Sequence, residues 1–259
     1  MTLPDFSDDT ALVTGATAGI GRAVALRLGR TGARVVLTGL GAEAGAAAVG
    51  EIEAAGGTAC FIESDLAGAD GWKTLWPAAR AAYGPVSIFV HCASPPRDES
   101  QTALRVTEDA WDAMLNANLR SGFFLAQAAA REMRSEGLAG RIVMMTSLHA
   151  YSPRNLPHYS AAKAGQAMVV RELARALGPD RIRVIGVAPG AIPGGGFKGD
   201  PGTLSHRIPM GRVGTPEDIA ASTVALLDND AFPYVTGDIV AVDGGIAQYN
   251  WLDRPESLD

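Results

Sequence analysis

The chain has 259 residues, of which 47% are hydrophobic and 19% charged, and its formal net charge is −6 at pH 7. This balance excludes a globally disordered chain, which combines low hydrophobicity with high net charge, and argues against a nucleic-acid-binding protein, which usually carries a basic surface. The two cysteines, Cys60 and Cys92, are too few for a disulfide framework and are typical of a reducing compartment. No apolar run reaches the ~18 residues of a membrane span, and the first residues lack the basic and apolar regions of a signal peptide. We therefore expect a cytoplasmic protein that binds neither nucleic acid nor membrane.

Short runs rich in Val, Ile, Leu and Met alternate along the chain with longer helical stretches. Strands are expected at residues 11–14, 34–38, 59–62, 86–91, 141–146, 181–187 and 238–242. Helices are expected at residues 20–31, 42–55, 70–82, 108–136, 158–178 and 216–228. Unbroken apolar runs are typical of strands buried on both faces, and strict alternation predicts right-handed crossovers within one parallel sheet. The sequence thus predicts a single α/β domain over residues 1–259, with helices on both faces of the sheet and an irregular loop of functional importance at about 190–211.

A glycine-rich turn with the sequence TGATAGIG occupies residues 14–21, between the first expected strand and the first expected helix. A strand that turns through glycines into a helix lets the backbone approach a pyrophosphate, and the helix N-terminus offers free N–H groups and a positive dipole. The turn lacks the Gly-Lys-Ser/Thr ending of a P-loop kinase or GTPase. Its position predicts a dinucleotide site, and the alternative is a glycine-rich turn without a ligand.

Tyr159 and Lys163 lie four residues apart in an expected helix, so their side chains share one face of that helix. A phenol, with an ordinary pKa of about 10, is a poor acid or base near neutral pH. A neighbouring ammonium group stabilises the phenolate, which suits the pair to general acid–base catalysis. The alternative for the pair taken alone is a solvated helix face.

Four motifs follow one another along the chain: TGATAGIG, then YSAAK at 159–163, APG at 188–190 and VDGG at 242–245. Together they resemble the short-chain dehydrogenase/reductase family over about residues 8–246. The resemblance implies a Rossmann fold with a doubly wound seven-stranded parallel sheet. It also implies hydride transfer between NAD(P) and a small polar secondary alcohol or ketone of the sugar, polyol or hydroxy acid class. The alternatives are a non-enzymatic NAD(P)-sensing protein on the same fold and, disfavoured by the short chain and the glycine spacing, a lyase, epimerase or dehydratase.

The resemblance implies four catalytic residues: Asn118, Ser147, Tyr159 and Lys163. The tyrosine would transfer the proton, the lysine would bind ribose, the serine would orient the substrate oxygen and the asparagine would complete a proton relay. Ser147 stands one residue closer to Tyr159 than is usual in the family, which leaves Thr146 as an alternative. Asn116 is the alternative to Asn118.

The resemblance also implies cofactor contacts at the carboxyl ends of the strands. They are Gly15, Thr17, Ala18, Gly19, Ile20, Gly21, Gly39, Leu40, Asp65, Leu66, Cys92, Ala93, Ser94, Tyr159, Lys163, Pro189, Gly190 and Ile192. Asp65 is expected to contact the adenine, with a helix N-cap as the alternative. His91 and Cys92 stand where the family usually has Asn-Asn, and no metal site is expected because no second Cys or His lies at a zinc-binding spacing.

The choice between NAD and NADP is expected at residues 38–41, Thr-Gly-Leu-Gly. This turn has neither the acidic residue that binds a ribose 2′-hydroxyl nor the arginine that accepts a 2′-phosphate. It is similar to the turn of bacterial 3-hydroxybutyrate dehydrogenases, which use NAD. An uncompensated phosphate beside a low-dielectric cleft is costly, so NAD is expected. NADP stays possible, with Arg22 as the group that could reach its phosphate.

The substrate is expected to contact His149 and Arg154. The Ser-x-His pattern at 147–149 is similar to that of 3-hydroxybutyrate dehydrogenases, in which the histidine helps to hold a carboxylate, but Leu156 replaces their lysine. Other candidates at the cleft, each with a surface loop as the alternative, are Ser94, Pro95, Arg97, Tyr151 and the loop 194–198. The glycines at 194–196 suggest a lid that closes over the substrate.

The family commonly forms tetramers through two long helices and its last strand, so the resemblance implies a homotetramer. Both expected helices carry small residues that would allow close approach across a two-fold axis, with packing inside the chain as the alternative. These residues are Ala126, Ala128, Ala129, Ala130, Ala161, Ala162, Ala164 and Ala167.

Overall fold

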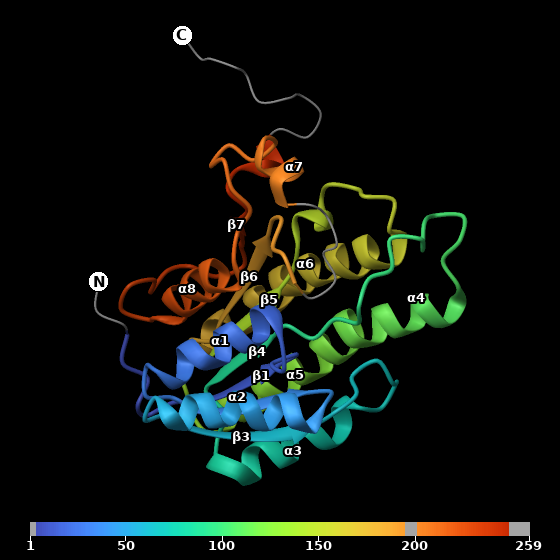
Figure 1. Ribbon diagram of the computed structural model, residues 1–259. Coiled ribbons are helices and arrows are strands. Elements are labelled where there is room, and N and C mark those ends of the chain that lie inside the picture. The colour runs from blue at the N-terminus through green and yellow to red at the C-terminus, as the bar shows by residue number, and fades with distance from the viewer. Residues whose placement is uncertain (1–3, 195–200, 249–259) are drawn as a thin grey trace.

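Seven parallel strands form one sheet in the order β3-β2-β1-β4-β5-β6-β7 in a computed structural model that describes residues 4–194 and 201–248. The strands are β1 (Thr10–Thr14), β2 (Arg34–Gly39), β3 (Thr58–Glu63), β4 (Ile88–His91), β5 (Arg141–Met145), β6 (Arg183–Pro189) and β7 (Ile239–Val242) (Figure 1). The strand order reverses between β1 and β4, and in such sheets ligands bind outside the carboxyl ends of the strands at that point. The predicted seven-stranded parallel sheet is confirmed.

Helices cover both faces of the sheet. On one face lie α1 (Gly19–Gly29), α2 (Ala42–Ala54) and α8 (Pro216–Leu227), and on the other lie α3 (Trp72–Tyr83), α5 (Ser121–Ser135) and α6 (Pro157–Leu177). Two further helices are α4 (Glu108–Leu115), which leads into α5, and the short α7 (Pro201–Ser205). Within the described residues, no helix combines the length and the apolar character needed to cross a bilayer.

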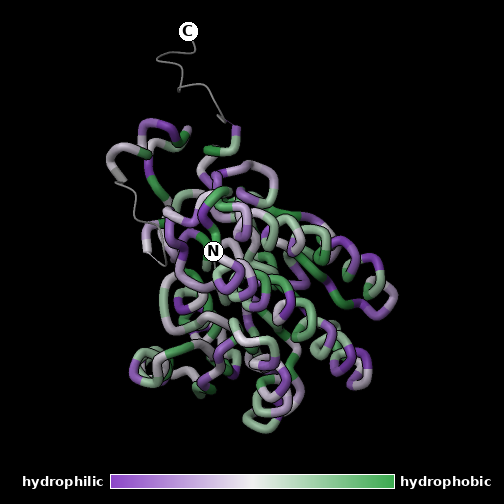
Figure 2. The backbone as a smooth tube through the Cα atoms, turned by 90° about the vertical axis from the view of Figure 1, so that its right-hand side faces the viewer, coloured by the Kyte–Doolittle hydropathy of each residue, from purple (hydrophilic) through white to green (hydrophobic). Residues whose placement is uncertain are grey.

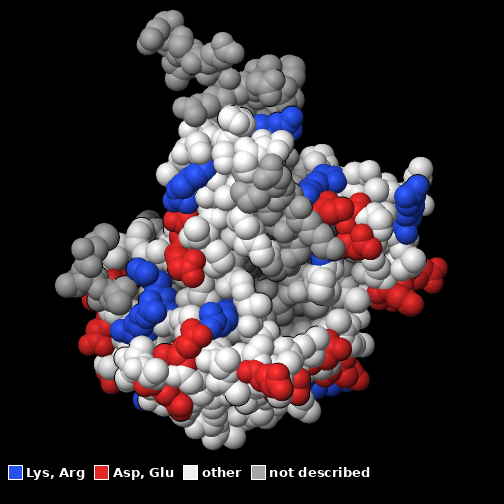
Figure 3. Space-filling view, viewed as in Figure 1, with Lys and Arg blue, Asp and Glu red and all other residues white. Residues whose placement is uncertain are grey.

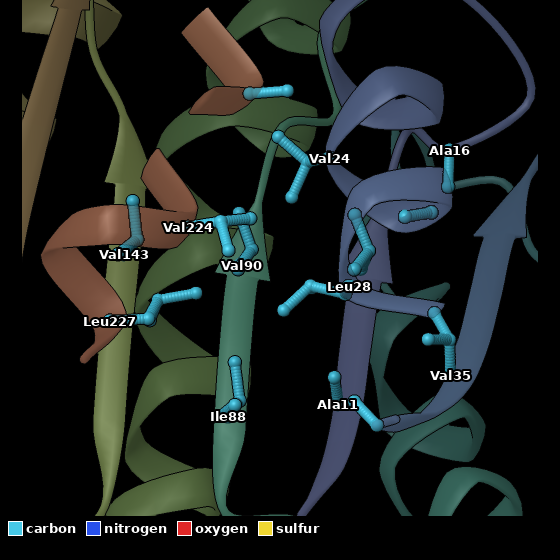
Figure 4. Close-up of a cluster of buried hydrophobic side chains, with 14 of the residues drawn as sticks. Ala11, Ala16, Val24, Leu28, Val35, Ile88, Val90, Val143, Val224 and Leu227 are labelled. Carbon is cyan, nitrogen blue, oxygen red and sulfur yellow. The ribbon is translucent and has the colours of Figure 1, made fainter. Parts of the chain in front are cut away.

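The apolar strands divide their side chains between two cores, because successive residues of a strand point to opposite faces. Val13 of β1 packs with the α1 and α8 side, whereas its neighbour Leu12 packs with the α3, α5 and α6 side. Figure 4 shows the first of these cores, where Val24 and Leu28 of α1 approach the side chain of Val90. Hydrophobic segments run through the interior of the molecule and hydrophilic ones along its outer turns (Figure 2). Burial on both faces explains why the strands read as unbroken apolar runs.

Several expected elements differ from the structure. β4 begins at Ile88 rather than 86, α1 ends at Gly29 rather than 31, and β6 ends at Pro189 rather than 187. β6 begins at Arg183 rather than 181, because a 3₁₀ turn at Gly178–Asp180 ends on Arg181 in the left-handed conformation. The helix expected at 108–136 is interrupted by a π-helical segment, Asn116–Arg120, between α4 and α5. The segment at 190–211, expected to be irregular, contains α7, while Gly195 and Gly196 of the expected lid lie outside the described residues.

Candidate active site

A pocket of about 950 Å³ opens along the carboxyl ends of the strands. Every residue expected to contact the cofactor lines it, as do Ser147, His149 and Arg154. The structure therefore brings together side chains from the glycine turn, from β2 to β6 and from α6. In the described part of the chain, no three His, Cys, Asp or Glu side chains gather where they could hold a metal ion.

The glycine turn packs closely against the end of β4 and leads into an uncapped helix N-terminus. A Cβ atom on Gly15 would lie 2.8 Å from the Ala93 Cα atom, and one on Gly21 would lie 2.2 Å from the Gly15 carbonyl oxygen, so both glycines allow close packing of the turn. Gly19 is the first residue of α1, and a Cβ atom on it would have no described atom within 4 Å. No side chain caps α1 at Ala18, which leaves the N–H groups of the first turn available to phosphate oxygens. The turn thus fits the expected cofactor.

An acidic residue that the sequence analysis missed lies beside the turn that follows β2. Glu63, the last residue of β3, pairs in register with Gly39, and its Oε1 atom accepts a hydrogen bond of 3.0 Å from the Gly41 N–H. The parallel register carries this carboxylate to the turn after β2. Arg22, the group considered for a 2′-phosphate, forms an ion pair with Glu51.

Asp65 lies at the rim of the pocket, and its Oδ1 atom accepts a 2.9 Å hydrogen bond from the Ala67 N–H. The N-cap alternative for this residue is wrong, since α3 begins at Trp72 and its N-cap is Gly71. The carboxylate instead shapes the loop that follows β3.

Tyr159 and Lys163 are buried in α6, with exposed fractions of 8% and 3%, so the alternative of a solvated helix face is wrong. The Lys163 Nζ atom lies 5.6 Å from the centroid of the Tyr159 ring. It donates hydrogen bonds to the Met145 carbonyl oxygen (2.7 Å) and to Gln166 Oε1 (3.0 Å). Burial lowers the pKa of Lys163 to about 7, because a low-dielectric environment disfavours the ammonium form.

The main-chain carbonyl of Asn118 belongs to the π-helical segment, a type of insertion that often marks functional sites. It accepts hydrogen bonds from Gln166 Nε2 (2.8 Å) and His91 Nε2 (3.0 Å). Gln166 therefore bridges Lys163 and Asn118, a role that no sequence motif indicated. Asn118 is fully buried while Asn116 is half-buried, which favours Asn118 of the two.

Ser147 and Thr146 both line the pocket, but only one of their hydroxyl groups has its hydrogen available. Thr146 Oγ1 donates to the Val187 carbonyl oxygen at 2.9 Å. Ser147 Oγ accepts a 3.2 Å hydrogen bond from the His149 N–H and keeps its own hydrogen for another acceptor. This difference favours Ser147 as the contact to a substrate oxygen.

His91, fully buried at the end of β4, joins three segments of the site. Its Nε2 atom lies 3.0 Å from the carbonyl oxygens of Ala117 and Asn118, which can only accept, so Nε2 carries the hydrogen. Its Nδ1 atom accepts from Thr14 Oγ1 at 2.9 Å, and Thr14 in turn accepts from the Cys92 N–H. Burial and the nearby Lys163 lower the pKa of His91 to about 4, so the ring is neutral at physiological pH.

Three further polar side chains line the pocket, and two of them, His149 and Arg97, lie against the Tyr159 ring. The His149 ring lies 6.1 Å from the Tyr159 ring, and its Nδ1 atom donates to the Ser152 carbonyl oxygen at 2.9 Å. Arg97 places its guanidinium carbon 4.7 Å from the centroid of the Tyr159 ring. Arg154 instead forms a 3.0 Å ion pair with Glu99.

Comparisons with known proteins agree with this geometry. A family model described as "Enoyl-(Acyl carrier protein) reductase" matches residues 15–247. The chain is 37% identical to L-rhamnose 1-dehydrogenase (NAD(P)(+)) of Azotobacter vinelandii over 92% of this chain and 96% of that protein. It is 35% identical to (3R)-3-hydroxyacyl-CoA dehydrogenase of Canis lupus familiaris over 91% of this chain and 95% of that protein. A crystal structure of a short-chain type dehydrogenase/reductase from Mycobacterium marinum superposes with a TM-score of 0.84 at 30% identity, covering 93% and 96% of the two chains.

Because His91 is buried in its neutral form, we expect acid to lower the free energy of unfolding of this protein. Its pKa is about 4 in the folded chain and about 6.5 when unfolded, so between these values the unfolded state binds more protons. The free energy of unfolding should therefore fall as the pH drops from 6.5 to 4, by up to about 3 kcal/mol from this group. Denaturant unfolding across this range should show a shallower decline in His91→Asn than in the parent.

The matched control is His206→Asn, since His206 is exposed. Its decline should follow that of the parent. An equal slope in His91→Asn and the parent would mean that His91 is not the group that titrates.

Proposed function

The chain belongs to the short-chain dehydrogenase/reductase family, and we propose that its buried Tyr159–Lys163 pair carries out proton transfer during hydride exchange with NAD. It is an oxidoreductase acting on hydroxylated substrates, a class that includes the sugar and the hydroxyacyl-CoA for which two of its relatives are named. The observation that carries the proposal is that this pair lines the same pocket as an uncapped, glycine-rich helix N-terminus. A chain that only sensed a dinucleotide would have no need for a buried phenol and ammonium side by side.

Each of the four catalytic residues has a distinct task in the proposed reaction. The nicotinamide, when bound, supplies the hydride acceptor or donor. Ser147 donates its hydroxyl hydrogen to the substrate oxygen, and Tyr159 takes the proton from an alcohol or returns it to a carbonyl. Lys163 binds the ribose hydroxyls, and its positive charge stabilises the phenolate. The Asn118 carbonyl, together with Gln166, holds the inner end of a path for that proton.

The charges around the turn at residues 38–41, where the cofactor ribose is expected, favour NAD over NADP. The Glu63 carboxylate accepts a hydrogen bond from the Gly41 N–H and so places a negative charge at this turn. That charge would repel the 2′-phosphate of NADP. Arg22 is paired with Glu51, so its charge is already compensated. The turn itself contributes no side-chain cation to balance a phosphate.

We also propose a cytoplasmic homotetramer. Both cysteines are free thiols, as expected in a reducing compartment. Most of the alanines considered for the interface pack inside the chain, including Ala126, Ala129 and Ala162, which have 0% exposure. Ala161 and Ala164 are exposed on α6 near Met168, and this stripe is what supports close approach of a second copy.

Replacement of the phenol tests the acid–base role. Tyr159→Phe should lower turnover by roughly 10²- to 10⁴-fold, because the variant loses the group that transfers the proton. Loss of one oxygen should leave the fold and dinucleotide affinity nearly unchanged. The measurements are steady-state turnover and fluorescence titration with NADH, and the fully exposed Tyr234→Phe serves as the control. Turnover within about tenfold of the parent would remove Tyr159 from this role.

Substitutions at Gly39 test the cofactor proposal. Gly39→Asp should raise the NAD/NADP ratio of kcat/KM, because a new carboxylate accepts from the ribose hydroxyls and repels a phosphate. Gly39→Arg and Glu63→Gln should lower that ratio. A Cβ atom at this position would lie 3.1 Å from Thr17, so Gly39→Ala controls for the slight crowding. Equal ratios in the Asp and Ala variants would mean that the ribose does not lie beside this turn.

A further inference from the structure

The pocket is positively charged around Tyr159, although the chain as a whole is acidic. Its described lining contains the charged residues Asp65, Arg97, Arg154 and Lys163. The one carboxylate among them, Asp65, follows β3 at the dinucleotide end of the pocket. On the face shown in Figure 3, by contrast, acidic and basic side chains are interspersed. A cationic cleft in an acidic protein concentrates anionic ligands at that cleft.

Arg97 is the arginine of this region that has no acidic partner among the described residues. Among the residues that the structure describes, Arg154 pairs with Glu99, whereas no carboxylate lies within ion-pair distance of Arg97. The Arg97 side chain is half-buried and stacks over the ring of Tyr159. Partial removal of a guanidinium group from water costs free energy unless a partner compensates it. A negative group of the ligand, bound beside Tyr159, would supply that compensation.

His149 adds a second constraint on the ligand. Because the Ser152 carbonyl oxygen can only accept, the Nδ1 atom of His149 carries the hydrogen. Burial, together with Arg154 and Arg97, lowers the pKa of His149 and favours the neutral ring. Its Nε2 atom is then a hydrogen-bond acceptor, which suits a hydroxyl group of the ligand and not a carboxylate. This reverses the role expected for His149 from the family resemblance.

Building on the proposed function, we propose that the substrate is a hydroxylated carboxylic acid. Arg97 binds its carboxylate, and His149 Nε2 accepts from one of its hydroxyl groups. The planar fork of a guanidinium group matches both carboxylate and phosphate oxygens. A carboxylate fits better here, because Arg97 offers one uncompensated charge while a phosphate monoester carries nearly two. Recognition by Arg97 makes it a specificity-determining residue.

Matched substrate pairs that differ in the carboxylate test this proposal. Oxidation of galacturonate against galactose, and of 3-hydroxybutyrate against 1,3-butanediol, is followed by NADH absorbance. The parent should prefer the acid in at least one pair, and Arg97→Gln should lower the acid/neutral ratio of kcat/KM by roughly 10- to 100-fold, mainly through KM. Arg97→Lys should keep part of the preference. Arg175→Gln, which changes an exposed arginine far along α6, is the control.

A binding measurement keeps the test independent of turnover. Malonate, an unreactive dicarboxylate, is titrated calorimetrically into the NADH-saturated parent and into Arg97→Gln, and only the parent should bind it. The proposal is overturned if the acid/neutral ratio stays within about twofold in Arg97→Gln, if the parent prefers the neutral member of both pairs, or if both proteins bind malonate equally. Oxidation of the neutral members that depends on Tyr159 would leave the proposed function intact in each of these cases.

Discussion

The neutral imidazole of His91 holds together the three segments that form the site. It accepts from Thr14 at the start of the glycine turn and donates to the carbonyl oxygens of Ala117 and Asn118 in the π-helical segment. Protonation would give the ring two N–H donors, and Nδ1 could no longer accept from Thr14. The geometry of the phosphate turn and of the Asn118 carbonyl therefore depends on the ring staying neutral, which its burial ensures.

The close packing around His91 and the glycine turn leaves no room for a side chain at two positions, 122 and 15. A Cβ atom on Gly122 would lie 2.8 Å from His91 Cδ2, and one on Gly15, which has φ +64°, would lie 2.8 Å from the Ala93 Cα atom. A histidine in place of the family's usual asparagine thus fits because residue 122 has no side chain. The larger ring in turn reaches two carbonyl oxygens at once, which ties β4 to the interrupted helix.

The sequence was sufficient for the sheet and for the residues that line the pocket, because both depend on local patterns. Strand burial shows in apolar runs, and the ends of parallel strands must meet at one edge. The sequence did not predict the hydrogen bonds of Gln166 and Glu63 or the ion pair of Arg22. Each of these depends on strand register or on contacts between distant segments. Glu63 reaches the ribose turn only because β3 is in register with β2. The sequence also predicted one helix over 108–136, where the structure has a π-helical segment between α4 and α5.

The charges of Lys163, Arg97 and the Tyr159 phenolate influence one another. Burial lowers the pKa of Lys163 to about 7, and the cation Arg97 acts in the same direction. Hydrogen bonds from Nζ to the Met145 carbonyl and to Gln166 support the ammonium form. Formation of the phenolate adds a negative charge beside the lysine, so release of the tyrosine proton and retention of the lysine proton favour each other. An anion bound by Arg97 would reduce the repulsion between the two cations, which links substrate binding to the charge state that proton transfer requires.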